Sequence, residues 1–401
     1  MCSSHARCFH RGLVISAMSN EAPTTTTAET KEQSSSPSVI SSAETPPAVI
    51  VEEQKTEAVQ PSAPLVDHIS QCNKRYSVSS YYSESDTKRP FNNFLKSVRW
   101  SPDGLCLLAS SEDNVLRLFE VPVTPSANAA LPSSPVPSSS VPSFPSLNAV
   151  LQAVEAETVY DFSWNPSMHS SRPPSCYFAT TSRQSPAHIW DAFTGKMKAS
   201  YVAYDRADEV TSAISLAFNP AGDKLYCGYH EVIRIFDVDR PARKEYEERE
   251  LVQLSGKAKK RKRRDGQRGL ISAICVAPEN DTYAAGSYTG QTCVYACDNG
   301  EMVCSLQSKG GITHLRFSPD GRYLFTGSRK DDEILCWDVR NTYQVLGRFY
   351  RKCDTNQHIS FDVDNLGGRF LATGSQDGQV YVYDLLSTPN AETAHLPVAF
   401  S

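Results

Sequence analysis

The chain lacks the short motifs that mark many catalytic and nucleotide-binding sites. Its 401 residues contain no GxxxxGKS/T, GxGxxG, HExxH or GxSxG sequence, which argues against a phosphate-binding loop, a dinucleotide site, a zinc peptidase and a serine hydrolase of these types. The nine histidines are dispersed; His188 in the string AHIWD is interpreted as a strand residue, and Asp331–Asp332 as solvated acids of a polar turn. We therefore predict a protein that is not an enzyme, with no catalytic residue, no cofactor and no small-molecule substrate.

Long apolar runs and paired cysteine motifs are also missing. No apolar stretch is long enough to span a membrane, and the short stretch Gly12–Ala17 is too weak for a signal peptide. Twelve cysteines are scattered through apolar strand patterns without a CxxC pair, and Cys293 and Cys297 have no second pair at zinc-ligand spacing. These absences predict a soluble intracellular protein with reduced, packed thiols, no metal site and no membrane partner.

Two segments are too rich in proline and serine to belong to a packed core. Residues 1–75 form a Ser/Thr/Pro-rich tail that buries too little apolar surface to offset its chain entropy, and we predict it to be disordered. Residues 122–148 read PVTPSANAALPSSPVPSSSVPSFPSLN. Proline at that density cannot join a sheet, so this stretch is predicted to be a loop insertion in a folded domain over residues 76–401.

The folded domain repeats one pattern six times. KSVRWSPDGLCLLASSEDNVLRLFEV, from Lys96, and ITHLRFSPDGRYLFTGSRKDDEILCWDV, from Ile312, share an apolar strand, a Ser-Pro-Asp-Gly turn, a second strand, a polar turn and a third strand ending in an aromatic and an acidic residue. The steps between equivalent positions are 64, 54, 58, 41 and 46 residues, and the longest contains the proline-rich insertion. The equivalent positions are Trp100, Trp164, Phe218, Val276, Phe317 and Val363.

This period and the strand alternation predict an all-β WD-repeat β-propeller with six recognisable blade units. Asp-Gly pairs supply the backbone angles of tight hairpins, and the aromatic ring of each terminal pair is expected to pack between blades. A β-sandwich, the alternative all-β fold, has less regular self-similarity. Gly-His dipeptides, usual at the start of WD units, are absent, so we expect the buried His–Asp network to be missing from most blades.

Basic side chains gather at corresponding places in the repeats. The net charge of −5 gives no global attraction to polyanions, so an anion-binding site must come from local clusters. In a propeller, the turn between the second and third strands of a blade and the segment leading into its first strand lie on one face, where binding loops gather. Lysine and arginine there predict a rim able to hold a phosphate backbone; an ordinary solvated rim with interspersed acids is the alternative. The rim candidates are Lys96, Arg183, Arg268, Lys309, Arg329 and Lys330, with Arg351 and Lys352 close by.

A second charged feature lies between the third and fourth units, in a predicted basic loop over residues 255–268. The string KAKKRKRR at 257–264 includes six consecutive basic residues, which cannot pack together and are predicted to be solvated and extended. Such a segment is typical of a nuclear-import signal or an RNA-contacting arm; a random charged loop is the alternative. The six residues are Lys259, Lys260, Arg261, Lys262, Arg263 and Arg264.

Several strings between Phe94 and Asp384 resemble the telomerase Cajal body protein family, among them TVYDFSW, HIWDAFTGKMKASYVAYD, LYCGYHEVIRIFDVDRPAR and GGITHLRFSPDGRYLFTGSRKDDEILCWDVR. The resemblance implies an RNA-binding scaffold that recognises the CAB box of small Cajal-body-specific RNAs and telomerase RNA and directs these ribonucleoproteins to Cajal bodies, in support of telomere maintenance. It implies as partners H/ACA proteins such as dyskerin, telomerase and a cytosolic chaperonin for folding. It also implies a location in the nucleus and Cajal body, with some protein in the cytoplasm.

The resemblance also sharpens the site hypothesis. Arg183 and Arg329–Lys330 match the family's SR and RKD turns, so the rim candidates become candidate RNA contacts. The alternative function is a generic WD-repeat adaptor between proteins of a nuclear complex, without direct RNA contact. Family propellers have a seventh unit, whereas this chain ends at Ser401 soon after the sixth. We therefore expect a ring lacking most of its last blade, with LPVAFS as the outer strand of unit six; closure by Tyr76–Phe94 is the alternative. KAKKRKRR is a further departure from the family pattern.

Overall fold

The computed structural model describes residues 93–121, 147–241, 245–255, 263–279, 281–365, 367–386 and 398–400. These residues all belong to one of two compact units of the chain. The predicted tail, most of the predicted insertion and the first part of the basic segment lie outside the described residues. In the part that the structure describes, no helix is long and apolar enough to cross a membrane, and no three His, Cys, Asp or Glu side chains are grouped so that they could hold a metal ion.

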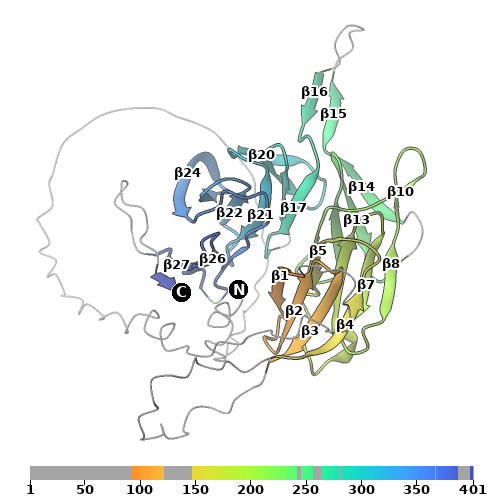
Figure 1. Ribbon diagram of the computed structural model, residues 1–401. Helices are drawn as coiled ribbons and strands as arrows, with labels where there is room; N and C mark the ends of the chain where they lie inside the picture. The colour runs from red at the N-terminus through yellow and green to blue at the C-terminus, as the bar shows by residue number, and fades with distance from the viewer. Residues whose placement is uncertain are drawn as a thin grey trace, which may run out of the picture. The chain divides into compact units, whose positions relative to one another are not determined.

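Among the described residues, six four-stranded antiparallel sheets follow one another along the chain, each built from four successive long strands (Figure 1). The strands are β1 (Leu95–Trp100), β2 (Cys106–Ser111), β3 (Val115–Glu120) and β4 (Ala149–Val154); β5 (Val159–Trp164), β6 (Tyr177–Ser182), β7 (Ala187–Asp191) and β8 (Met197–Tyr201); β11 (Ser215–Phe218), β12 (Lys224–Gly228), β13 (Val232–Asp237) and β14 (Tyr246–Glu250); β17 (Ile271–Val276), β18 (Thr282–Ser287), β19 (Gln291–Ala296) and β20 (Met302–Gln307); β21 (Ile312–Phe317), β22 (Tyr323–Ser328), β23 (Glu333–Asp338) and β24 (Asn341–Tyr350); and β25 (Phe361–Val363), β26 (Phe370–Gly374), β27 (Val380–Asp384) and β28 (Val398–Phe400).

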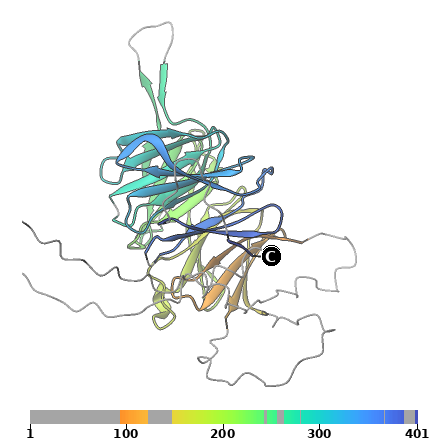
Figure 2. The same ribbon diagram turned by 90° about the vertical axis from the view of Figure 1, so that its left-hand side faces the viewer.

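The sheets are the blades of a six-bladed β-propeller, numbered here one to six in chain order. The first strands of successive blades lie side by side, β5 against β11, β11 against β17, β17 against β21 and β21 against β25, and the four strands of each blade follow from there in sequence order. Figure 2 shows the blades as separate groups of antiparallel arrows. The predicted all-β propeller is confirmed. The predicted outer strand in LPVAFS is also confirmed, because β28 pairs with β27.

The Ser-Pro-Asp-Gly turns close the hairpin between the first and second strands. In blade five, the Ser318 hydroxyl accepts a hydrogen bond from the Tyr323 amide at 2.9 Å, and Gly321 adopts a φ of 67°, which favours glycine. The same contact recurs in blade one, where the Ser101 hydroxyl accepts from the Cys106 amide at 2.9 Å. The repeated motif therefore sets the same turn at the same edge of both blades.

Apolar side chains fill the space between neighbouring blades. Trp190, at the end of the third strand of blade two, lies in one buried cluster with Leu108 and Leu116 of blade one. Trp337 of blade five lies in another with Ala284 and Val294 of blade four. The terminal aromatic rings thus pack between blades as predicted. Burial of each such side chain contributes about 1.5–3 kcal/mol.

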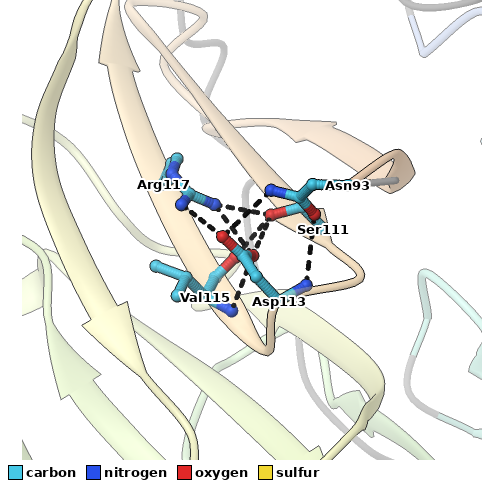
Figure 3. A network of polar contacts seen from close by, with 5 residues as sticks. All are labelled: Asn93, Ser111, Asp113, Val115 and Arg117. Carbon is cyan, nitrogen blue, oxygen red and sulfur yellow. Dashed lines mark hydrogen bonds and ion pairs between the residues drawn. The ribbon is translucent and has the colours of Figure 1, made fainter. Parts of the chain in front are cut away.

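Buried polar networks hold three of the blades together at the edge where WD units usually carry a His–Asp pair. In blade one, Asp113 accepts hydrogen bonds from the side chains of Asn93 at 3.0 Å and Ser111 at 2.6 Å. Arg117 donates to the same carboxylate at 3.0 Å, and the Val115 amide at 3.3 Å. Figure 3 shows these five residues converging on one turn.

Glutamate and glutamine take the corresponding place in blades two and four. Glu155 and Gln267 each stand nine residues before the anchor position of their blade, and they are 3% and 0% exposed. Glu155 accepts from Ser182 at 2.9 Å and from Trp190 at 3.1 Å. Gln267 donates to the Ala285 and Gln291 carbonyls and accepts from Tyr295. The Gly-His dipeptides are indeed absent, but other residues build a network in these blades.

Between blades three and four the chain forms a further hairpin, which corrects the prediction of an extended basic loop. Strands β15 (Val252–Ser255) and β16 (Arg263–Gly266) pair antiparallel, with Ser255 opposite Arg263 and Leu254 opposite Arg264. Two of the six consecutive basic residues therefore have their backbone in a strand. The remaining elements are a second short hairpin of β9 (Ala203–Tyr204) and β10 (Val210–Thr211) and a 3₁₀ turn, η2 (Pro173–Ser175).

Candidate nucleic-acid interface

Backbone hydrogen bonds bring the predicted rim positions to one edge of the blades. The turn between the second and third strands bonds to the segment that leads into the first strand of the same blade, as from the Arg183 amide to the Thr158 carbonyl and from the Arg329 amide to the Gly311 carbonyl, both at 2.9 Å. The Lys330 amide continues the edge to the next blade by donating to the Thr355 carbonyl at 3.2 Å. The turns between second and third strands and the segments that lead into first strands therefore lie next to each other along one edge of the blades, which we call the rim.

The six candidate RNA contacts differ in how free their charges are. Lys96 lies in β1 and is paired with Glu112 at 2.8 Å. Lys309 is paired with Glu333 at 3.3 Å, although Arg348 also binds that carboxylate at 2.5 Å. The Lys309 side chain is largely exposed, whereas Lys96 and Glu112 are half-buried, so Lys309 can exchange its carboxylate for a phosphate more easily than Lys96 can. The other four candidates, Arg183, Arg268, Arg329 and Lys330, lie in the turns and leading segments of the rim.

Arg329 is stacked on an aromatic ring that the sequence analysis did not single out. Its guanidinium carbon lies 4.0 Å from the ring centroid of Tyr288, which comes from the corresponding turn of blade four and is 42% exposed. A guanidinium over an aromatic ring can still donate N–H groups to phosphates or base edges, although Arg329 Nε itself is buried and has no partner among the described residues. The signal for Tyr288 was present in the sequence, as the aromatic residue of the SYTG turn that matches the SRKD turn of blade five.

In the same blade, three buried polar atoms have no hydrogen-bond partner among the described residues: the Ser308 hydroxyl, Asp331 Oδ2 and Arg329 Nε. Ser308 stands nine residues before the blade's anchor, the position that Gln267 occupies in blade four. Ser308 and Asp331 are each 6% exposed, and within the described residues the Ser308 hydroxyl and Asp331 Oδ2 form no hydrogen bond. Burial raises the pKa of the Asp331 carboxyl above its ordinary value. Ser308 therefore does not build the network that Glu155 and Gln267 build at the corresponding position, although buried polar atoms without partners also occur among the described residues of blades one and four.

Arg351 was predicted, with Lys352, to lie among the basic side chains close to the rim, and the structure shows that its side chain is not available there. Its side chain is 2% exposed and donates to the Ile359 carbonyl at 2.7 Å and the Thr373 hydroxyl at 3.1 Å. Burial lowers the pKa of its guanidinium. Arg351 is a buried link between blades five and six, whereas its neighbour Lys352 is exposed.

Two histidines close to the first strands of blades five and six add no positive charge at neutral pH. His314 Nδ1 and His358 Nε2 are 2.9 Å apart, and the two rings are stacked. Burial, together with the nearby Arg99 and Arg351 charges, lowers the pKa of His358 to about 4, and burial lowers the pKa of His314 as well. With both pKa values lowered, this pair of rings adds no positive charge to the rim at neutral pH.

Comparison with known proteins shows which proteins the chain is similar to. The WD domain, G-beta repeat family matches residues 89–120, 300–338 and 356–384. The chain is 41% identical to telomerase Cajal body protein 1 of Homo sapiens over 308 residues, which is 77% of this chain and 52% of the relative. The protein of that name in Mesocricetus auratus is also 41% identical, over 76% of this chain and 53% of the relative. A guanine nucleotide-binding protein negative regulator 1 of Schizosaccharomyces pombe is 30% identical over 72% of this chain and 70% of its own length.

The chain belongs to the telomerase Cajal body protein family. The resemblance predicted from the sequence strings is thereby confirmed. The chain spans about half the length of the telomerase Cajal body protein 1 relatives that it matches. The matched WD repeats include blade five with its SRKD turn, because the second match ends at residue 338.

Proposed function

We propose that this protein is a non-enzymatic RNA-binding scaffold that recognises the CAB box of small Cajal-body-specific RNAs and telomerase RNA and directs these ribonucleoproteins to Cajal bodies. The proposal includes H/ACA proteins such as dyskerin, telomerase and a cytosolic chaperonin as partners. It places the protein in the nucleus and Cajal body, with a cytoplasmic fraction, and gives it a part in telomere maintenance. Family membership supports the general role, and the rim supports the contact with RNA.

The basic rim is the observation that supports the proposed contact with RNA. The chain has a net charge of −5, yet lysine and arginine recur in the turns that backbone bonds bring to one edge. The Arg329–Tyr288 stack adds a planar surface to that edge. Proteins that recognise single-stranded loops combine these two features, because cations hold the phosphates and aromatic or guanidinium planes hold unstacked bases.

Titration of the purified full chain with a CAB-box hairpin, and with the same hairpin carrying a scrambled loop, tests the proposal. We expect loop-specific binding that weakens steeply with salt. The double variant Arg329→Glu/Lys330→Glu is expected to weaken binding and to lower the slope of log K against log salt by about 1 to 2. The matched control is Lys196→Glu/Lys224→Glu, which makes the same charge change at exposed positions on the opposite edge.

Two results would overturn the proposal. Equal, weak binding of both hairpins would favour the alternative function, a WD-repeat adaptor that binds proteins and does not contact RNA. Unchanged affinity of the Arg329/Lys330 variant, with circular dichroism showing a folded protein, would remove the rim from the RNA site. A control variant that loses as much affinity would show that net charge, and not the rim, sets binding.

We further propose that the basic segment Lys259–Arg264 is a nuclear-import signal or an arm that contacts RNA. The described part of that segment is the backbone of Arg263 and Arg264 in β16. Replacement of residues 259–264 by serine and glycine in a fluorescent fusion separates the two roles. Cytoplasmic retention with unchanged affinity for the CAB-box hairpin indicates an import signal, whereas nuclear accumulation with weaker RNA binding indicates an arm.

A further inference from the structure

One apolar face of blade one belongs to no interface between blades in the part of the chain that the structure describes. Five buried apolar clusters join successive blades in pairs, from blades one and two to blades five and six. A sixth cluster takes all its described members from blade one and the residues next to its strands. We call this surface the blade-one face. Its members include the buried Ala109, Val121 and Leu147 and the half-buried Leu95, Val98, Leu107 and Ala149.

Strand alternation shows that the blade-one face is turned away from blade two. In β2, Leu108 packs in the cluster shared with blade two, whereas its neighbours Leu107 and Ala109 belong to the blade-one face. In β4, Ala153 packs towards blade two, so Val154 points the other way, and it is 62% exposed. An apolar face that extends over several strands and stays partly exposed marks an interaction surface.

The other blades show what covers the corresponding face. The aromatic residue at the end of the third strand, Trp190 in blade two and Tyr383 in blade six, packs against the blade that precedes its own in the chain. In blade one the corresponding residue is Phe119, which belongs to the blade-one face. Residues 76–92 directly precede blade one and contain no repeat unit. This segment therefore stands in the chain where the preceding blade stands for each other blade.

The composition of residues 76–92 differs from that of the rest of the tail. Residues 10–75 contain no Phe, Trp or Tyr, whereas residues 76–91 contain four. Tyr76, Val78 and Tyr82 are separated by even numbers of residues, which places them on one side of an extended strand. A segment with this pattern has apolar side chains to bury, unlike the Ser/Thr/Pro-rich sequence before it.

The segment also ends at the right place. It leads directly into Asn93, whose side chain donates a hydrogen bond to Asp113 at 3.0 Å, and Leu95 of the blade-one face follows two residues later. A strand over residues 76–82 would be about 23 Å long. The ten residues 83–92 can span up to about 33 Å, which is enough to turn that strand back along blade one.

We propose that residues 76–92 dock on the blade-one face, with Tyr76, Val78 and Tyr82 packed against its apolar side chains. The segment does for blade one what the preceding blade does for each other blade. The docked segment agrees with a folded domain that begins at residue 76. The inference goes beyond the proposed function and does not depend on RNA binding, because the blade-one face and the rim turns consist of different residues.

Photo-cross-linking of the full chain tests the contact directly. The photoreactive residue p-benzoylphenylalanine is placed at position 82 or, as the control, at position 50 in the part of the tail without aromatic residues. We expect position 82 to give intrachain adducts in peptides that contain residues 95–111, and position 50 to give none there. Adducts between two chains, or intrachain adducts that leave out blade one, would overturn the proposal.

Hydrogen exchange then measures what docking does for blade one. The variant Tyr76→Ser/Val78→Ser/Tyr82→Ser is expected to exchange the backbone amides of residues 95–111 about 10-fold faster or more, with blades three and four unchanged as an internal reference. It should also unfold at a lower urea concentration. The matched control, Val49→Ser/Ile50→Ser/Val51→Ser, removes three apolar side chains from the same tail and should behave like the unmodified protein.

Each remaining outcome decides against docking. Equal exchange in the triple variant and the unmodified protein refutes it, and so does a lower urea midpoint without faster exchange in blade one. Protection of residues 95–111 that rises with protein concentration, together with a dimer in sedimentation, would assign the blade-one face to a second copy of the chain. If the triple variant does not fold, the cross-linking experiment still decides, because it leaves the apolar pattern of the segment in place.

Discussion

The buried carboxylate of Glu155 provides the sharpest test of what holds a blade together without the usual His–Asp pair. Its side chain receives hydrogen bonds from the hydroxyls of Thr180 and Ser182 at 2.5 and 2.9 Å and from the Trp190 indole at 3.1 Å. His188 Nδ1 lies 3.1 Å from Oε2. One residue from the segment between β4 and β5 thus connects β6 and β7. Glu155→Ala would remove the shared acceptor of four groups at once.

The size of the effect follows from what the substitution leaves behind. The Trp190 indole keeps its bond to Thr180 at 2.9 Å, so the loss concerns the hydroxyls of Thr180 and Ser182, the His188 ring and the second bond of the indole. Removal of one partner from a buried charged network costs about 3–5 kcal/mol. We expect Glu155→Ala to lower the free energy of unfolding by that amount in urea titrations followed by tryptophan fluorescence.

The exposed neighbour Glu157 supplies the control. Glu157→Ala should change the free energy of unfolding by no more than about 0.5 kcal/mol, as is usual for exposed sites. Glu155→Gln should fall between the two, because the amide retains one acceptor but directs an NH₂ group at hydrogen-bond donors. A loss below about 1 kcal/mol for Glu155→Ala in a folded protein would refute the claim that this network stabilises blade two.

The pH dependence of the same residue gives an independent check. Burial alone would raise the pKa of Glu155, but the hydrogen bonds from His188 and Thr180 outweigh it and hold the pKa below the ordinary value of 4.5. A carboxyl with a lowered folded-state pKa stabilises the protein above its unfolded-state pKa, and the contribution is lost as the pH falls through the folded-state value. The stability difference between the protein and Glu155→Gln should therefore be constant near pH 7 and shrink below about pH 4.5. A constant difference down to pH 3 would contradict the assignment.

Three further predictions concern other buried positions. Gly266 has a φ of 121°, and a Cβ there would lie 2.0 Å from the Leu251 carbonyl oxygen. Gly266→Ala should lower the free energy of unfolding, measured by urea titration, by about 2 kcal/mol or more, and by more than Gly378→Ala, whose added Cβ meets open space; equal losses would contradict this. Gln267→Leu removes the partner of the Ala285 carbonyl and the Tyr295 hydroxyl and one of the two donors to the Gln291 carbonyl, which keeps its bond from Ser287; it should cost about 2–3 kcal/mol, and unchanged thermal unfolding would refute it. Burial raises the pKa of the Cys227 thiol, so mass spectrometry should find it alkylated by iodoacetamide in urea but not in buffer; rapid labelling in buffer would show that blade three opens.

The architecture could be predicted from the sequence because its determinants are local. Ser-Pro-Asp-Gly sets a turn through contacts within a few residues, as between Ser318 and Tyr323, and alternation alone places residues on the two faces of a strand. The positions of the rim candidates could be predicted for the same reason. Once the turns of each repeat are known, the topology brings Arg183 and Arg329 to the same edge.

The parts that the sequence did not predict depend on partners far along the chain. Gln267 has its partners in β18 and β19, and the stack of Arg329 on Tyr288 joins turns of different blades. Arg351 looked like a rim residue because its charge suggested solvent, but its acceptors come from blade six. The basic block was predicted to be extended because its composition excludes packing; it could not reveal that β15 supplies a backbone partner for Arg263 and Arg264.

The fold is predicted by residues that recur from blade to blade, whereas a recognition site is predicted by residues that differ between blades. Residues that recur, such as the turn serines and the terminal aromatic rings, do the same task in each blade and cannot distinguish one part of the rim from another. A recognition site has to lie where a blade departs from the pattern. Glu155 and Gln267 depart from it but restore the buried hydrogen bonds by other means. Blade five departs from it at Ser308, whose hydroxyl has no partner among the described residues, but buried polar atoms without partners also occur in blades one and four. What distinguishes this part of the rim is therefore the arginine stacked on Tyr288.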